Sequence, residues 1–124
     1  MNQLPKIMLI EDDSDLADAL ADVLTMEGYR IVYAADGMAA LALLAESELP
    51  DLILLDLMMP NMNGWEFREA QRLNERLAAI PVVVLSATGE RSRPIEATRI
   101  LRKPVTLETL LATVKEVAFA RKKS

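Results

Sequence analysis

Short apolar runs alternate with amphipathic stretches along this chain. Five runs of three to five residues are rich in Ile, Leu and Val, the last of them weaker than the others, and they lie at 6–10, 30–34, 51–55, 82–85 and 99–101. In the first, third and fourth runs the apolar residues follow one another without alternation. Continuous runs of this kind are typical of parallel strands that helices cover on both faces. The pattern therefore predicts five strands.

Between the runs, apolar residues recur at helical spacing. The first helix is expected to contain Leu16 to Glu27 and to be closed by Gly28, because glycine is common just beyond helix C-termini. Asp36 is a candidate N-cap for a second helix, and Thr106 is one for the last helix. The second helix contains Leu41 and Leu44, and the inward-facing positions of the last are expected at Leu107, Leu110, Leu111, Val114 and Val117.

A turn signal at 61–64 precedes another stretch with helical spacing. Its apolar positions are Phe67, Ala70, Leu73 (or Asn74) and Leu77, and Pro81 is expected to close it. Strands and helices thus alternate with short connections, which predicts an α/β fold with a doubly wound five-stranded parallel sheet.

Length and composition exclude several classes of protein. The 124 residues favour a single domain over 1–124. The longest apolar run, 38–45, is far shorter than the roughly 20 residues of a membrane span, so we expect a cytoplasmic protein with no membrane partner. Cysteine and histidine are both absent, which excludes disulfides, thiol chemistry, histidine acid/base catalysis and the Ser-His-Asp triad. Any bound metal must be a hard cation with oxygen ligands.

The charge is unevenly distributed. Residues 1–62 carry twelve acidic side chains against two basic ones, whereas residues 63–124 carry seven against twelve. One interpretation is an acidic site in the first half and a basic partner surface in the second. The alternative is that solvated faces differ by chance.

Polar residues follow four of the predicted strands: Glu11-Asp12-Asp13, Asp56, Ser86 and Lys103. Because the carboxyl ends of parallel strands share one edge of a sheet, these side chains are expected to converge there. Clustered carboxylates repel one another, and a divalent cation relieves that repulsion. Oxygen ligands point to Mg²⁺, and an aspartate beside it can act as a nucleophile and form an aspartyl phosphate.

Each of these residues also has an ordinary structural explanation. Acids at strand ends often cap helices, and Asp13 or Ser14 is expected to be such a cap. Ser86 is as well suited to a cap as to a ligand, and Lys103-Pro104 alone is only a turn. The convergence of four strand ends favours the functional interpretation.

In these motifs the chain resembles the receiver domain of bacterial two-component response regulators, over a core of about 5–120. The matching segments are Ile7 to Asp13, Leu54 to Gly64, Val84 to Ala87 and Arg102 to Pro104. The resemblance implies a flavodoxin-like fold with strand order 2-1-3-4-5; a receiver is a standard example of that order.

The resemblance also implies a role for each site residue. Asp56 is the implied phosphoacceptor, Asp12 the direct Mg²⁺ ligand, Glu11 its helper, usually through water, and the backbone carbonyl of Met58 a further ligand. Ser86 matches the hydroxyl that contacts the phosphoryl group, and Lys103 the signature lysine of the family.

Two departures from the family pattern concern the switch region. Ile100 stands where receivers usually carry Tyr or Phe. The stretch from Ser86 to Lys103 is about one helical turn or more too short, so the fourth helix is expected to be shortened or missing. We expect a loop or a single turn over 89–98, with Arg91, Arg93 and Arg102 either available to an acidic partner or simply solvated.

The predicted function is a phosphoacceptor that receives a phosphoryl group from a histidine kinase or histidine phosphotransfer protein and signals by binding an effector protein. Met1 and the basic end mildly favour a single-domain protein over a fragment of a longer regulator. One rival is a receiver-fold interaction module that works without phosphorylation. Another is a phosphohydrolase of the haloacid-dehalogenase type, disfavoured because Met58 stands where that class needs an acid. No motif for direct nucleic-acid binding accompanies the basic end.

Overall fold

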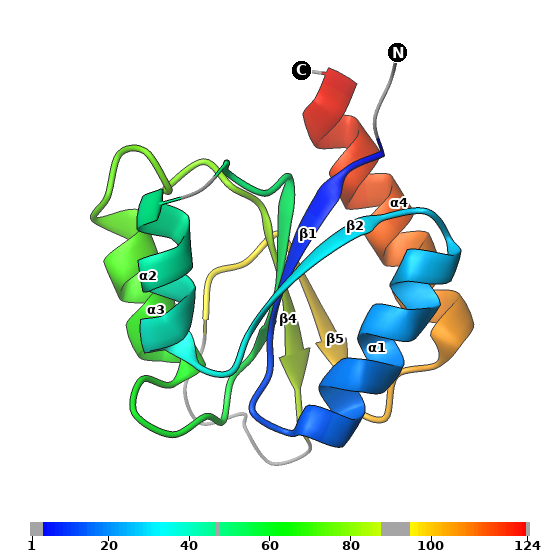
Figure 1. Ribbon diagram of the computed structural model, residues 1–124, viewed down its shortest axis with the longest axis horizontal. Coiled ribbons are helices and arrows are strands. Elements are labelled where there is room, and N and C mark those ends of the chain that lie inside the picture. Colours follow the sequence, from blue (N-terminus) through cyan, green and yellow to red (C-terminus); the bar gives the residue numbers. More distant parts are fainter. Residues whose placement is uncertain (1–3, 47, 88–94, 124) are drawn as a thin grey trace.

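The computed structural model describes residues 4–46, 48–87 and 95–123. Five parallel strands form one sheet in the order β2-β1-β3-β4-β5 (Figure 1). The bounds of β1 to β5 are Lys6–Ile10, Arg30–Ala34, Leu52–Asp56, Val82–Ser86 and Arg99–Arg102. This order confirms the predicted doubly wound, flavodoxin-like sheet.

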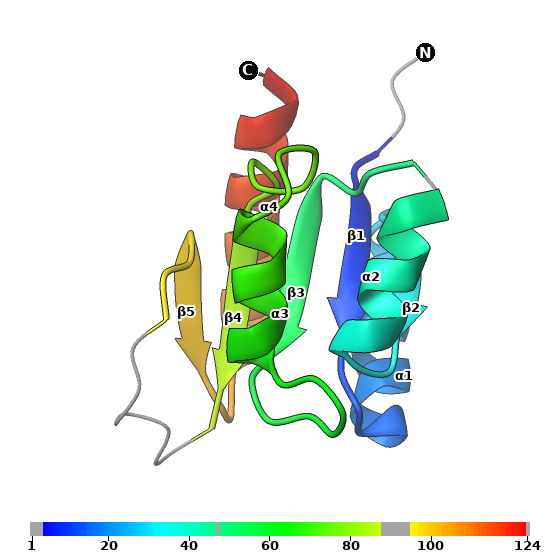
Figure 2. The same cartoon turned by 90° about the vertical axis from the view of Figure 1, so that its left-hand side faces the viewer.

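Helices cover both faces of the sheet. Within the described residues they are α1 (Ser14–Met26), α2 (Gly37–Glu46), α3 (Gly64–Arg72) and α4 (Leu107–Lys123). Figures 1 and 2 show α1 and α4 on one face and α2 and α3 on the other. The chain is therefore a three-layer α/β/α structure. None of the helices in the described part combines the length and the apolar character that crossing a membrane requires.

The core consists of two clusters, one on each face of the sheet. Successive strand residues point to opposite faces, so Ile7 and Leu54 pack toward α1 and α4, whereas Met8 and Leu55 pack toward α2 and α3. Every residue of β1, β3 and β4 is buried. This burial on both faces explains why these three strands are continuous apolar runs in the sequence.

The residues predicted to cap the helices do so in the structure. Asp13 Oδ1 accepts hydrogen bonds from the N–H groups of Asp15 and Leu16, so Asp13 is the N-cap of α1. The Asp36 carboxylate accepts from Ala39 N–H at 2.9 Å, and Thr106 Oγ1 accepts from Thr109 N–H at 3.1 Å. At the other end of α1, Gly28 has a φ of 97°, which glycine adopts without steric cost.

The prediction for the third helix was wrong at its C-terminus. The spacing suggested a helix that reaches Leu77, but α3 ends at Arg72, and Leu73 is 78% exposed. The buried Gln71 side chain explains the end: its Nε2 donates to the carbonyls of Leu77 and Ile80 at 3.0 Å each. These bonds satisfy carbonyls of a compact turn that replaces further helix. Leu77 is still buried, but from that turn.

A second correction concerns the last helix. Leu110, Val114 and Val117 of α4 are buried as predicted, but Leu107 is 52% exposed. Leu107 is the first residue of α4 and lies beyond the edge of the core, in an apolar groove between α1 and α4 that Leu16 and Val105 also line.

Between β4 and β5 the described residues contain no helix, which confirms the expected loss or shortening of the fourth helix. Ile95 and Ala97 pack against the core cluster on the α3 face, and Arg68 Nε donates to the Glu96 carbonyl at 2.8 Å. Most of the predicted loop or single turn over 89–98, with Arg91 and Arg93, lies outside the described residues.

The role of Gln71 leads to a prediction about stability. Replacing it by methionine in Gln71→Met keeps a long side chain but removes the amide donor from the Ile80 carbonyl and leaves the Leu77 carbonyl with the Ile80 N–H alone. We expect the free energy of unfolding to fall by about 2–3 kcal/mol, as is usual for buried polar groups that lose a partner. Urea denaturation measures the change. Glu69→Met, at an exposed position of the same helix, is the control and should alter stability by less than about 0.5 kcal/mol. Equal losses in the two variants contradict this role for Gln71.

Candidate functional site

The polar residues predicted to converge do so at the carboxyl edge of the sheet. Asp56 and Ser86 are the last residues of β3 and β4, Glu11 directly follows β1, and Lys103 directly follows β5. The strand register places these four residues at the same edge of the sheet. Leu55 pairs with Ile10, Asp56 with Leu85, and Ser86 with Arg102. The structure thus assembles the site from four strand ends.

Three carboxylates form a tight cluster at this edge. One oxygen each from Glu11, Asp12 and Asp56 lies within 4.8 Å of the others. Glu11 and Asp56 are only 1% and 4% exposed, whereas Asp12 is exposed to solvent. Asp13, the third acid of the run, instead serves as the N-cap of α1. The sequence left this choice between Asp13 and Ser14 open.

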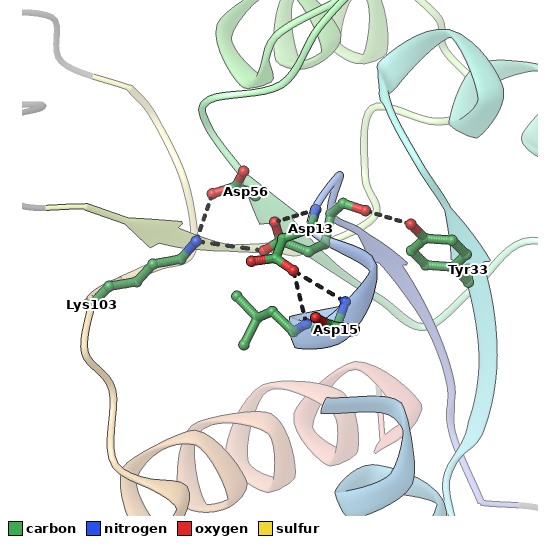
Figure 3. Close-up of polar contacts among 7 residues, drawn as sticks. Asp13, Asp15, Tyr33, Asp56 and Lys103 are labelled. Carbon is green, nitrogen blue, oxygen red and sulfur yellow. Dashed lines mark hydrogen bonds and ion pairs between the residues drawn. The ribbon is translucent and has the colours of Figure 1, made fainter. Parts of the chain in front are cut away.

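Lys103 provides the opposite charge for the cluster. Its Nζ lies 2.9 Å from Asp56 Oδ1 and 3.5 Å from Glu11 Oε1 (Figure 3). The backbone N–H of Lys103 donates to the Ser86 carbonyl at 2.7 Å, which continues the pairing of β4 and β5 by one residue. The lysine therefore reaches the acids from a backbone that the sheet holds in place. The peptide bond between Lys103 and Pro104 is cis.

The charges shift each other's protonation. Burial raises the pKa of Glu11, and the negative charge of Asp56 raises it further, while the Asp13 N–H and Lys103 partly offset both. Burial alone lowers the pKa of Lys103, but its hydrogen bond and charge interaction with Asp56 and Glu11 outweigh that effect and raise the pKa overall. Lys103 is therefore a cation at neutral pH.

The other two predicted site residues lie nearby. Ser86 is buried, and its Oγ donates to the neighbouring Ala87 carbonyl at 3.3 Å, a long hydrogen bond. Met58 is two residues beyond Asp56, in the loop that leads to α3, and its side chain is exposed. Both therefore lie at or just after strand ends in the positions that the resemblance requires, Ser86 on β4 beside β3 and Met58 two residues after Asp56.

Comparison with known proteins identifies the family. Residues 7–115 match the family described as response regulator receiver domain. The chain is a receiver domain. Its family belongs to two-component signalling and consists of phosphoacceptors rather than classical enzymes.

Named relatives agree with this assignment. The receiver domain is 38% identical over 117 residues to the DNA-binding dual master transcriptional regulator RpaA of Synechocystis, covering 90% of this chain and 48% of that protein. It spans about half the length of the curated relatives that it matches.

Solved structures share the fold. The signal receiver domain of a histidine kinase from Syntrophus aciditrophicus superposes with a TM-score of 0.89 at 26% identity, covering 97% of this chain and 94% of that one. Chemotaxis protein CheY4 of Vibrio cholerae has a TM-score of 0.80 at 31% identity, over 92% and 98% of the two chains.

Sequence reasoning missed the contact that holds the β3–α3 loop of this receiver domain. Asn61 has a φ of 65°, and its Nδ2 donates to Asp36 Oδ2 at 2.8 Å. The Gly37 N–H also donates to the Met62 carbonyl at 3.3 Å. The hydrogen bond from Ala39 N–H, and then that from Asn61, lowers the pKa of Asp36. The available signal was Asn61 itself, because asparagine tolerates a positive φ better than most residues.

A tyrosine that the sequence did not single out also borders the site. The Tyr33 hydroxyl, from β2, donates to the Glu11 backbone carbonyl at 2.7 Å (Figure 3). Burial raises the pKa of Tyr33, and the surrounding acids, Glu11 first, raise it further, so the phenol is a protonated donor at neutral pH. An exposed tyrosine on an edge strand carries no sequence signal that distinguishes it from a surface residue.

Gly64 allows α3 to begin directly against the backbone of the site. A Cβ at Gly64 would lie 2.8 Å from the Leu57 Cα and 3.0 Å from the Asp56 carbonyl oxygen. At Gly37, the first residue of α2, a Cβ would instead meet the flexible side chain of Met62, at 2.7 Å from its Cγ. Of these two glycines, it is Gly64 at which the backbone itself must move to admit a methyl group.

We expect Gly64→Ala to lower the free energy of unfolding by about 1–3 kcal/mol, the usual result of overpacking. Gly37→Ala is the matched control, since both glycines begin helices, and it should cost clearly less because a methionine side chain can change rotamer. Urea denaturation of both variants tests the difference. A loss at Gly37→Ala as large as that at Gly64→Ala contradicts the explanation.

Proposed function

We propose that this receiver domain accepts a phosphoryl group on Asp56 from a histidine kinase or histidine phosphotransfer protein, with Mg²⁺, and signals by binding an effector protein. The observation that carries the proposal is the set of three carboxylates within 4.8 Å of one another, with Lys103 Nζ 2.9 Å from Asp56. Family membership supports the class of donor.

Asp56 is suited to act as the nucleophile. It lies at the end of the buried strand β3, and it faces the lysine cation. In the proposed transfer an Asp56 oxygen forms a bond to phosphorus as the bond from phosphorus to the donor's imidazole nitrogen breaks, and the electron pair of that bond stays on the nitrogen. An acyl phosphate on Asp56 results.

The donor set fits Mg²⁺. Glu11, Asp12 and Asp56 offer only oxygen atoms, which Mg²⁺ prefers, and exposed Asp12 leaves one side open to water. We assign Asp12 and Asp56 as ligands, with the Met58 carbonyl as a third and Glu11 acting through water. When bound, the ion neutralises charge on the phosphoryl oxygens.

Ser86 and Lys103 are proposed to hold the remaining phosphoryl oxygens. Lys103 already contacts Asp56, so a short movement of its flexible side chain transfers its charge to a phosphoryl oxygen. Among the described residues the Ser86 hydroxyl donates a long 3.3 Å bond to the Ala87 carbonyl, and a rotation of this hydroxyl would bring it to a better acceptor.

A receiver-fold interaction module that works without phosphorylation is the second candidate. It is favoured by the switch region, where Ile100 is 48% exposed on β5 and the described residues between β4 and β5 contain no helix. Beryllofluoride with Mg²⁺, which mimics the phosphoryl group, discriminates between the two. Thermal stabilisation by the mimic supports the phosphoacceptor, whereas no shift supports the module.

Phosphorylation of Asp56 is tested by intact mass after incubation with acetyl phosphate and Mg²⁺. Wild type should gain the mass of one phosphoryl group, and Asp56→Asn should gain none, because the amide keeps the volume but is not a nucleophile. Asp22→Asn changes an exposed acid of α1 in the same way and should be modified like wild type. An adduct that forms on Asp56→Asn at the wild-type rate contradicts the assignment.

Met58 leads to a prediction about the lifetime of the phosphorylated form. Its thioether cannot donate a hydrogen bond and is a weak acceptor, so it cannot orient an attacking water. We expect slow loss of the phosphoryl group from wild type and a severalfold faster loss from Met58→Asn.

The decay is followed by intact mass after the donor has been removed. Met26→Asn, at an exposed position at the far end of α1, is the control and should decay like wild type. Unchanged or slower decay of Met58→Asn shows that water is oriented by another group.

A further inference from the structure

We propose that Tyr33 is a positioning residue for the magnesium site: its hydroxyl holds the peptide group that links Glu11 to Asp12. The inference rests on the proposed function, because it concerns the same site. It adds a residue on β2, a strand that contributes no other group to the carboxylate cluster.

The β1–α1 turn is tied to β2 at two points. The Glu11 N–H donates to the Ala34 carbonyl at 3.1 Å, which continues the pairing of β1 with β2. The backbone carbonyl of the same residue, Glu11, accepts a hydrogen bond from the Tyr33 hydroxyl at 2.7 Å. Figure 3 shows the ring reaching the turn from the side opposite Lys103. The first contact is made by backbone alone, and the second depends on a side chain.

The orientation of Asp12 depends on this peptide group. Among the described residues no hydrogen bond or ion pair to the Asp12 carboxylate is present, unlike Glu11, which bonds Asp13 N–H and Lys103. The backbone therefore sets where the Asp12 side chain starts, and no such contact among the described residues restricts its rotamer. A peptide group is planar, so fixing the Glu11 carbonyl also fixes the Asp12 nitrogen and the start of the Asp12 side chain.

The other bonds of the turn leave this peptide unsupported on its carbonyl side. Glu11 Oε2 accepts from the Asp13 N–H at 3.2 Å, and Asp13 Oδ1 accepts from the first N–H groups of α1. These contacts hold residues on either side of the Glu11 carbonyl. Without the Tyr33 hydroxyl, the contacts on either side of the peptide group between Glu11 and Asp12 remain, but the plane of that peptide group can tilt more freely.

Removal of the Tyr33 hydroxyl should lower the affinity of the site for Mg²⁺ and its selectivity for Mg²⁺ over Ca²⁺. An ordinary hydrogen bond contributes an amount that corresponds to about a 2- to 10-fold change in an equilibrium constant. Mg²⁺ requires near-ideal octahedral geometry, whereas Ca²⁺ accepts irregular coordination at longer distances. A tilted Asp12 should therefore weaken Mg²⁺ binding more than Ca²⁺ binding.

The test compares Tyr33→Phe, which removes only the hydroxyl, with wild type by isothermal titration calorimetry of Mg²⁺ and of Ca²⁺ into the full chain. Tyr29→Phe is the matched control, because Tyr29 is buried in the core cluster on the α1–α4 face, against Phe119, and not in the carboxylate site. Thermal unfolding in EDTA reports any general effect on the fold.

We expect Tyr33→Phe to raise the Kd for Mg²⁺ about 3- to 10-fold and to change the Kd for Ca²⁺ by less than about twofold, with Tyr29→Phe like wild type in both. An unchanged Mg²⁺ Kd, or equal weakening of both ions, overturns the role of Tyr33 while leaving the proposed function intact. A wild-type chain that binds no Mg²⁺ overturns the metal site itself, and with it this inference.

Discussion

The contact of Lys103 with Asp56 and Glu11 is the interaction on which the site depends. Two nearly buried carboxylates side by side are costly unless an opposite charge and hydrogen bonds compensate them. Lys103 comes from the far edge of the sheet, 47 residues after Asp56 and 92 after Glu11. The compensation therefore exists only when β1, β3, β4 and β5 are in register. The site is thus assembled by the sheet itself.

The loops after the strands are held by side chains as well as by the sheet. Asp13 fixes the start of α1, and the Asn61–Asp36 contact ties the loop after β3 to the start of α2. Tyr33 adds a contact from β2 to the turn after β1. Each of these bonds joins a loop to an element that provides no acid to the cluster. A rigid surrounding of this kind keeps the acids within reach of one ion at little entropic cost.

The β4–β5 side of the molecule differs in character. Where the family resemblance implies a fourth helix, the described residues 95–98 are not helical, with Ile95 and Ala97 on the core and Glu96 bonded to Arg68. Ile100 then lies half exposed on the edge strand. An aliphatic side chain lacks the polar end that lets a tyrosine exchange a buried for a solvated position. We therefore expect any switch in this receiver domain to use another group.

The sequence by itself determined the strands, most helix ends and the members of the site. Continuous apolar runs identified the three central strands, caps such as Asp13, Asp36 and Gly28 were found because they act on their own neighbours, and the motifs at strand ends located the acids and Lys103. Only the tertiary structure decided the early end of α3, the exposure of Leu107 and the contacts of Asn61 and Tyr33. The reason is that these outcomes depend on packing and on side-chain contacts that lie outside the local spacing of helices and strands. The amide of Gln71 ends α3 by bonding Leu77 and Ile80, and the hydroxyl of Tyr33 reaches Glu11 from the neighbouring strand β2, so no local pattern records either.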